Sequence, residues 1–253
     1  MDLPFTRDQL FEVFTIANDR THMLSTIAGY LGALGWVFLR RSPKRSTFTI
    51  LYGGLSLLWG WIAVGFFWGP FSSLAASSWP FGGLFLLQSA LFFRMAIRNP
   101  NRLPQPSTAW NQGIGIALEV YALVVYPGLG LLTGHHAGDL PWFGIAPCPS
   151  TIWTLGVLIG TGGFGRKELM IPLAWCAVGL VAAARLGVVQ DWGLGVAAGL
   201  ATWCWMAGRP HRQTTLATMP SCRQAASPTP QKRSVSAQDP RQGTDTHRPS
   251  PVV

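Results

Sequence analysis

The stretch GIGIALEVYALVVYPGLGLLT, residues 113–133, holds a single charged side chain, Glu119, among aliphatic, aromatic and glycine residues. A helix needs about 20 such residues to cross the hydrocarbon core of a bilayer. Six further stretches have the same apolar character, and together the seven predict an all-α membrane protein, a bundle of seven transmembrane helices. The other six predicted spans are 22–39, 48–68, 80–97, 151–164, 169–187 and 192–207.

The composition points to the same class of protein. The chain is 49% hydrophobic but only 11% charged, whereas roughly a quarter of the residues of a soluble domain are charged. Many of its 12 tryptophans fall near predicted span ends, the positions that tryptophan favours at the membrane interface. The formal charge of +9 comes from loops and the C-terminal segment, not from a basic face. We therefore expect the lipid bilayer as a partner, and no nucleic acid.

Basic residues alternate between the two sides of the predicted bundle. The connections after spans one, three and five carry arginine or lysine, and those after spans two and four carry none. Cytoplasmic loops are enriched in these residues, so the N-terminus is predicted outside and the C-terminus in the cytoplasm. Omitting the short span 151–164 would place Arg166 and Lys167 outside and break the alternation.

Two segments flank the predicted transmembrane domain, residues 22–207. Within residues 1–21 we expect an amphipathic helix over 3–19, which begins with a capping box between Thr6 and Gln9. This helix is expected either to lie in the membrane interface or to pack on the bundle. Residues 208–253 are rich in Pro, Ser, Thr, Gln and Arg, and we predict a disordered, basic cytoplasmic tail.

Small residues at four-residue spacing predict the places where helices approach each other closely. Examples are Gly113 with Ala117 and Gly156 with Gly160. Without a large side chain, two helix backbones can come into direct contact.

Glu119 is the acidic side chain that lies deepest in a predicted span. Gln112, Glu119 and Tyr126 are spaced by seven residues and therefore share one face of a helix. Because ionisable residues inside a membrane are functional candidates, one hypothesis makes Glu119 a proton or ion relay. The alternative is a structural carboxyl group, hydrogen-bonded to Gln88 or to a backbone carbonyl.

Two further residues bear on this choice. Pro127 lacks the N–H that would bond a carbonyl one turn earlier, so it should free a carbonyl beside the polar stripe. The spans offer Glu119 no evident cationic partner, which predicts a protonated carboxyl. If Glu119 is ionised after all, Arg94 is the first candidate for a partner.

A second polar group is predicted at the outer face. Its members are His135, His136, Cys148, Thr151, Arg185 and Asp191. His, Cys and Asp are metal-ligand types, but their spacing matches no ligand signature. We expect instead a rigid turn in which Ser150 caps span five, Asp191 caps the last helix and Cys148 is a small buried filler. This expectation includes no metal, no cofactor and no disulfide at Cys148.

Several motifs resemble a known family. They are Leu3-Pro4-Phe5-Thr6, Tyr126-Pro127, Ala146-Pro147-Cys148-Pro149, Ile171-Pro172-Leu173 and Asp191-Trp192-Gly193. The set, over about Leu3 to Met206, is similar to a bacterial family of integral membrane proteins classed only as a domain of unknown function, family 6064. The resemblance implies a bacterial plasma (inner) membrane setting and transfers no catalytic role.

The sequence therefore leaves three functional hypotheses. The first is a small transporter or ion-coupled protein that uses Glu119 and acts on a small solute or ion. The second is a membrane-embedded enzyme or metal-handling protein that acts at the outer face through His135, Cys148 and Asp191. The third is an accessory subunit without chemistry of its own.

Overall fold

The computed structural model describes residues 4–21, 23–41, 45–98, 107–162 and 164–207, and these contain helices and turns but no strand. The α-helices are α1 (Arg7–Thr21), α2 (Leu24–Leu39), α3 (Arg45–Trp61), α4 (Ser78–Arg98), α5 (Ala109–Val120), α6 (Tyr126–Leu132), α7 (Pro147–Thr161), α8 (Arg166–Leu186) and α9 (Trp192–Ala207). Two π-helical segments, η1 (Ile62–Phe67) and η3 (Tyr121–Val125), continue α3 and α5. Short 3-10 turns are η2 (Pro70–Ser73), η4 (Ala137–Asp139) and η5 (Val189–Asp191). The predicted tail, 208–253, lies outside the described residues.

Four helical stretches are long and apolar enough to cross a membrane. They are 46–73, 78–98, 109–132 and 166–186. The pair α1 and α2, bent by 83°, would make a fifth if it formed one span. At 1.5 Å per residue, the 15 residues of α7 reach only about 22 Å. Each predicted span coincides largely with one helix or helix series, but the number of seven spans is not confirmed.

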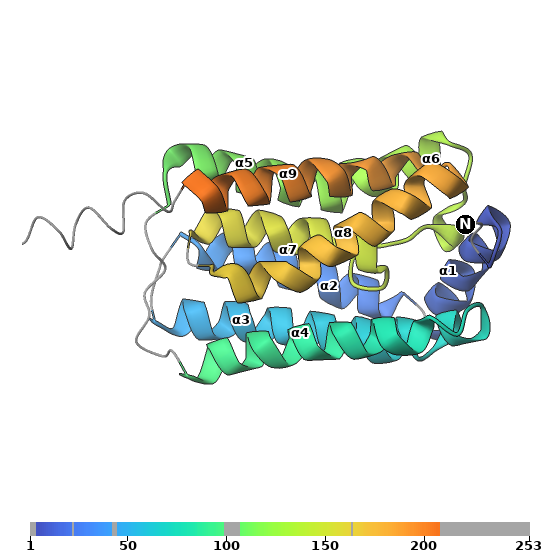
Figure 1. Ribbon diagram of the computed structural model, residues 1–253, viewed down its shortest axis with the longest axis horizontal. Helices are drawn as coiled ribbons and strands as arrows, with labels where there is room; N and C mark the ends of the chain where they lie inside the picture. The colour runs from blue at the N-terminus through green and yellow to red at the C-terminus, as the bar shows by residue number, and fades with distance from the viewer. Residues whose placement is uncertain (1–3, 22, 42–44, 99–106, 163, 208–253) are drawn as a thin grey trace, which may run out of the picture. The chain divides into compact units, whose positions relative to one another are not determined.

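Helix α7 lies at the centre of the bundle, between α5, α8 and α9 (Figure 1). Nearly every residue from Pro147 to Ile159 is buried. An all-round apolar helix without charge is suited to this place, because it has no face to present to water. Gly156 and Gly160 of α7 form a close helix contact, as predicted. Their partner on α5 is Gly115, whereas the four-residue spacing had indicated Gly113. A Cβ on Gly115 would lie 2.6 Å from the Gly156 carbonyl oxygen.

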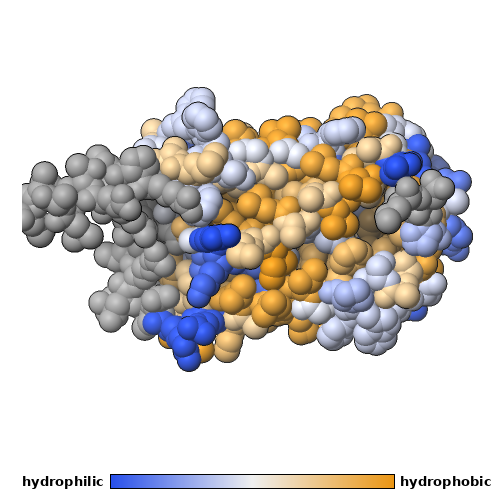
Figure 2. Space-filling view, in the orientation of Figure 1, coloured by the Kyte–Doolittle hydropathy of each residue, from blue (hydrophilic) through white to orange (hydrophobic). Residues whose placement is uncertain are grey.

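The two ends of the bundle differ in charge. Helices α2 and α4 end, and α3 and α8 begin, at one end, which we call the basic end because it carries Arg40, Arg41, Arg98, Arg166 and Lys167. Helix α1 lies at the opposite end, the α1 end (Figure 1). Between the ends, many large apolar side chains are exposed, for example Leu57 and Leu87. Figure 2 shows this apolar surface over the middle of one face. Such a surface fits a bilayer.

Two prolines inside long helices each leave a backbone carbonyl without its usual donor. In an α-helix the N–H of residue i bonds the carbonyl of residue i−4, and proline has no N–H. The carbonyl four residues before Pro127 is that of Leu123, which accepts a hydrogen bond from the Tyr30 hydroxyl at 2.7 Å. The freed carbonyl was predicted, and its donor comes from α2.

Pro172 in α8 has the same effect on the carbonyl of Glu168. The Gln88 amide of α4 donates to this carbonyl at 3.2 Å. Gln88 is fully buried, and its amide nitrogen therefore closes the hydrogen-bond gap that Pro172 opens. This is a structural role, distinct from the predicted pairing with Glu119.

Helix α1 packs on the loop that precedes α7. The predicted capping box is confirmed: the Thr6 N–H donates to the Gln9 side chain at 2.9 Å, and the Gln9 N–H donates to the Thr6 hydroxyl at 3.4 Å. Phe11 and Phe14 are buried beneath the helix. On the loop side, the Thr15 hydroxyl donates to Asp139 at 2.9 Å. Apolar packing and hydrogen bonds together therefore fix α1 on this end of the bundle.

Candidate functional site

Glu119 has a cationic partner, and the prediction of an unpaired carboxyl was wrong. The Arg40 Nη1 donates to Glu119 Oε2 at 3.0 Å, and the Trp36 indole donates to Oε1 at 3.4 Å. The Glu119 side chain is 6% exposed and that of Arg40 is 29% exposed. Arg40 follows the last turn of α2, so its long side chain reaches one turn back into the bundle. Arg94, the predicted candidate, is not this partner.

The predicted polar stripe does not form one cluster. Gln112 is exposed, and its amide donates to the Ser107 carbonyl at 3.2 Å. Glu119 pairs with Arg40, while Tyr126 lies almost two turns further along and contacts the segment between α8 and α9. Spacing by seven places the three residues on one face, but their partners belong to different helices.

Tyr126, Cys148 and Asp191 meet at the α1 end. The Tyr126 hydroxyl donates to Asp191 Oδ1 at 2.5 Å, and the Cys148 thiol also hydrogen-bonds the Asp191 carboxylate. Asp191 is 4% exposed and Tyr126 1%. The sequence placed Tyr126 in one candidate group and the other two in a second. The fold joins them because α6 contacts η5, while α7 packs against α8 and α9, the helices on either side of η5.

Burial dominates the electrostatics of Asp191. It raises the pKa of this carboxyl from an ordinary value of 3.8 to about 6, although the hydrogen bonds from Tyr126 and Cys148 favour the ionised form. Among the described residues, the groups that stabilise the carboxylate are thus a hydroxyl and a thiol, both neutral. Asp191 therefore changes charge within the physiological range of pH.

A cavity of about 290 Å³, the aromatic chamber, adjoins this cluster. Its aromatic lining consists of Phe5, Phe11, Phe14, Phe66, Phe67, Phe71, Phe81, Tyr126 and Trp175. Neighbouring rings are in contact: the centroids of Phe67 and Trp175 lie 5.2 Å apart, edge to face. Cys148 and Asp191 also line the chamber, and Asp191 is the acidic side chain among its described lining residues. The exposed residues Pro4, just before α1, and Val181 of α8 line it as well, so the chamber reaches the surface both near α1 and beside α8.

Helix α1 forms a wall of this chamber and is held there by further contacts besides the hydrogen bond from Thr15 to Asp139. Arg7 Nη2 lies 2.8 Å from His135 Nε2, and the His135 ring stacks on Phe11 with centroids 3.8 Å apart. The Asn18 amide donates to the carbonyls of Gly138 and Leu140. Burial and the neighbouring Arg7 charge lower the pKa of His135. A neutral imidazole can accept the hydrogen bond from the guanidinium.

The other predicted outer-face residues do not join Asp191. His136 and Arg185 are exposed, and the Thr151 hydroxyl donates to the Pro147 carbonyl within α7. Across the described ranges, no group of three or more His, Cys, Asp and Glu side chains is placed to hold a metal ion. Cys148, Cys176 and Cys204 are free thiols.

Two predicted helix caps differ from the structure. Helix α7 begins at Pro147, so Ser150 lies inside its first turn, where its hydroxyl donates to the Ala146 carbonyl and accepts from the Gly144 N–H. Asp191 directly precedes α9, but its carboxylate accepts from the side chains of Tyr126 and Cys148. In both places a tertiary contact takes the side chain that local pattern assigned to a cap.

Sequence reasoning missed the aromatic lining and the role of Arg40. Phe66 and Phe67 lie at the end of the predicted span 48–68 and Phe71 lies just beyond it, where aromatic residues are ordinary. In the sequence, Arg40 belongs to a basic loop, which indicates only the orientation of the chain. A usable signal did exist for Arg40, because a long cation at the last turn of a span can reach an acid inside the bundle.

No curated protein and no solved structure matches the chain. The sequence model of one family matches residues 7–215, which include α1, both prolines and the Tyr126–Asp191 pair. The chain therefore belongs to this family, the family of unknown function DUF6064.

Proposed function

We propose that this chain is a polytopic membrane protein that binds a small aromatic amine in the aromatic chamber, with Asp191 as the counter-charge of the amine. The observation that carries this proposal is a buried carboxylate in an aromatic cavity, with the neutral donors Tyr126 and Cys148. An ionised carboxylate in such surroundings is costly unless a cation pairs with it. A ligand ammonium group would supply that cation.

The lining supports a ligand of this chemistry. Ammonium groups are attracted to the faces of aromatic rings, most strongly where water is excluded. The volume of about 290 Å³ is at the lower end of the range for ligand pockets, which favours a molecule with one ring. The opening beside Val181 lies on an apolar surface, so an amphiphilic amine can enter from the bilayer side.

Protonation of Asp191 provides a coupling between ligand and proton. With a pKa of about 6 in the empty chamber, the carboxyl exchanges its proton near neutral pH. A bound ammonium stabilises the ionised form, so binding of the amine and binding of the proton oppose each other. In the hypothesis of an ion-coupled transporter, the residue that exchanges a proton is therefore Asp191. Glu119 is a poorer candidate because Arg40 already neutralises its charge.

The hypothesis of an enzyme or metal-handling protein draws less support from the geometry. It requires His135 beside Cys148 and Asp191, but His135 contacts Arg7 and Phe11. A purely accessory role would leave the chamber without a ligand. The binding experiment below separates that role from the proposal.

The proposal includes seven spans in a bacterial plasma membrane, with the α1 end outside and the basic end in the cytoplasm. The basic residues at one end support this orientation. A thiol reagent that cannot cross membranes should label a cysteine placed at Gly138 in intact cells, above the labelling of the parent chain, but not one placed at Ser42. Labelling at Ser42 with none at Gly138 would reverse the orientation.

Ligand binding is tested with phenethylamine and its neutral analogue 2-phenylethanol, by calorimetry on the purified full chain at pH 7.5. We expect the amine to bind about 10- to 100-fold more tightly, the range that corresponds to one hydrogen bond to a charged group. Asp191→Asn should abolish this preference, because the amide carries no charge.

Asp139→Asn is the matched control, since it makes the same change in the loop beside α1, where Asp139 accepts from Thr15. This variant should keep the preference for the amine. Equal affinity of the wild type for the two compounds, or a preference that survives Asp191→Asn, would refute the proposal.

A further inference from the structure

A long apolar groove lies between α2 and α3 and is lined by residues of both helices. Its volume is about 820 Å³. Gly32 of α2 and Gly54 of α3 line it, and a Cβ added at either would meet no atom within 4 Å. The two helices therefore leave open space between them where side chains of ordinary size would close it.

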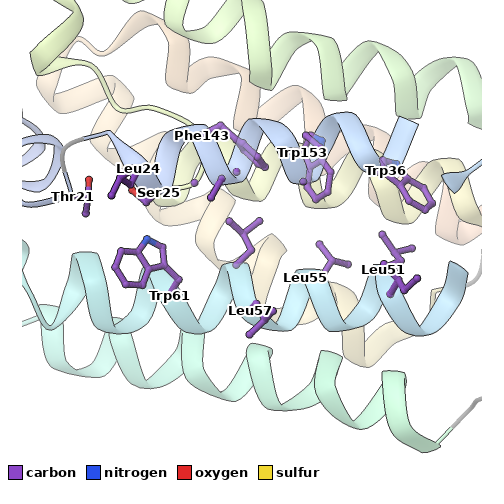
Figure 3. A pocket seen from close by; sticks show the side chains of 18 of the residues that line it. Thr21, Leu24, Ser25, Trp36, Leu51, Leu55, Leu57, Trp61, Phe143 and Trp153 are labelled. Atoms are coloured by element: carbon purple, nitrogen blue, oxygen red, sulfur yellow. The ribbon is translucent and has the colours of Figure 1, made fainter. Parts of the chain in front are cut away.

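The groove is polar at one end and apolar along its length. Figure 3 shows Thr21, Ser25 and Trp61 at one end, with the Trp61 ring turned across the groove, and Leu51 and Trp36 at the other. Arg20, at the polar end, is exposed and has no hydrogen-bond or ion-pair partner among the described residues. This arrangement complements an anionic headgroup joined to a hydrocarbon chain.

Two buried donors in the groove lack partners. The Trp153 side chain is 6% exposed, lines the groove, and its indole nitrogen has no hydrogen-bond partner in the described part of the chain. The Ser25 hydroxyl, also in the lining, is buried and unpartnered in the same sense. Buried donors normally have an acceptor. At the polar end, beside Arg20, the ester oxygens of a lipid can accept from the Ser25 hydroxyl, whereas Figure 3 shows Trp153 nearer the Trp36 end, where the acyl chain would lie.

The length of the groove suits one acyl chain. Helix α2 has 16 residues and therefore extends over about 24 Å. This exceeds half of the roughly 30 Å hydrocarbon core, so a chain of one leaflet fits along it with its headgroup at Arg20. Exposed leucines lie on both helices at the groove, for example Leu31 beside it and Leu57 in its lining.

We infer that the α2–α3 groove holds one phospholipid of the surrounding bilayer, with an acyl chain between the helices and the phosphate on Arg20. The inference stands apart from the amine in the aromatic chamber, since the groove and the chamber have separate linings. It assigns a specific lipid site to a face of the molecule that would otherwise contact bulk lipid.

Native mass spectrometry of the full chain, purified in mild detergent, tests this assignment. We expect one retained phospholipid per chain, and at least about tenfold less retention in the double variant Gly32→Leu/Gly54→Leu, whose side chains fill the groove. Gly83→Leu in α4 is the matched control: a Cβ there also meets no atom within 4 Å, but Gly83 lies outside the groove. Retention in Gly83→Leu should equal that of the wild type.

The headgroup is tested by adding dioleoylphosphatidic acid or dioleoylglycerol, which differ by the phosphate. The wild type should prefer the phospholipid by about tenfold, and Arg20→Gln should lose that preference while still holding the chain, because one charge-assisted hydrogen bond is removed. Equal retention in the groove-filling and control variants would overturn the inference. So would a chemical cross-link between two copies through α2 and α3, which would identify a second copy as the occupant.

Discussion

The bundle buries two carboxylates in opposite ways. Glu119, near the basic end, lies 3.0 Å from the guanidinium of Arg40 and within reach of the Trp36 indole. Asp191, at the α1 end, is bound only by the hydroxyl of Tyr126 and the thiol of Cys148 among the described donors. Both side chains are almost fully buried. The two sites therefore differ in the charge of the group that binds the carboxylate, and not in the exposed fraction of the acidic side chain.

This difference separates a structural acid from a functional one. A buried charge with an internal counter-ion is already compensated, and breaking the pair mainly costs stability. A buried charge without an internal counter-ion destabilises the folded chain, and binding of a proton or of a cationic ligand removes this destabilisation. Glu119 was the more conspicuous residue in the sequence, but Asp191 has the surroundings of a binding group.

The largest expected effect is the pH dependence that Asp191 gives to stability. Its pKa is raised from 3.8 to about 6 on folding, so the folded chain keeps a proton that the unfolded chain has lost between about pH 4 and 6. The stability contributed by this group is therefore present below pH 4 and is lost as pH rises to 6, by about 3 kcal/mol at about 1.4 kcal/mol per pKa unit.

Asp191→Asn cannot ionise and should remove this loss. Thermal unfolding in detergent should show the variant more stable than the wild type at pH 7.5, with the advantage shrinking towards pH 4. The Asp139→Asn control should follow the wild type throughout. Parallel curves for Asp191→Asn and the wild type would mean that Asp191 does not carry the pH dependence.

Removal of Glu119 should have the next largest effect and the opposite sign. Glu119→Leu leaves Arg40 and Trp36 without an acceptor and should destabilise the chain by about 2 kcal/mol. This is below the usual 3–5 kcal/mol for a broken buried pair, since Arg40 is 29% exposed and can reach solvent.

The double variant Glu119→Leu/Arg40→Leu sharpens this test. It removes both charges and should recover much of the loss in denaturant or thermal unfolding. A double variant that is as unstable as the sum of the two single variants would show that the pair is not coupled.

The smallest effect is expected from two matched tyrosine substitutions, each about 1 kcal/mol for one lost hydrogen bond. Tyr30→Phe leaves the Leu123 carbonyl unbonded, and Tyr126→Phe removes a donor from Asp191. Only the second should also raise the pKa of Asp191, because the hydrogen bond from Tyr126 lowers it. Equal pH profiles of the two variants would contradict the assignment of Tyr126.

The helices themselves were accessible to sequence reasoning because apolar length and composition fix where a chain can be helical in a membrane. The carbonyls freed by Pro127 and Pro172 follow from the i−4 rule alone. Their donors, Tyr30 and Gln88, do not. Which helix supplies a donor depends on how the helices pack, and residue spacing within one helix holds no information on that.

Only part of the candidate site could be predicted from the sequence, because its members come from helices whose packing the sequence pattern does not give. The prediction groups Cys148 and Asp191 because both lie on the same predicted side of the membrane. In the structure the two side chains are in contact. Tyr126 was assigned to Glu119 by its spacing, although its hydroxyl bonds Asp191. The phenylalanines of the chamber come from α1, from the α3–η2 region and from α4. A cavity between three separate segments leaves no pattern in any one of them.

Infrared titration of the purified chain tests most directly whether Asp191 is the carboxyl that changes charge. We expect a protonated-carboxyl band that fades with a midpoint near pH 6, that is absent in Asp191→Asn, and that persists in Glu119→Gln. Phenethylamine should lower the midpoint, since the ammonium stabilises the carboxylate. A band that disappears in Glu119→Gln and remains in Asp191→Asn would reverse the roles of the two acids and contradict the proposed site.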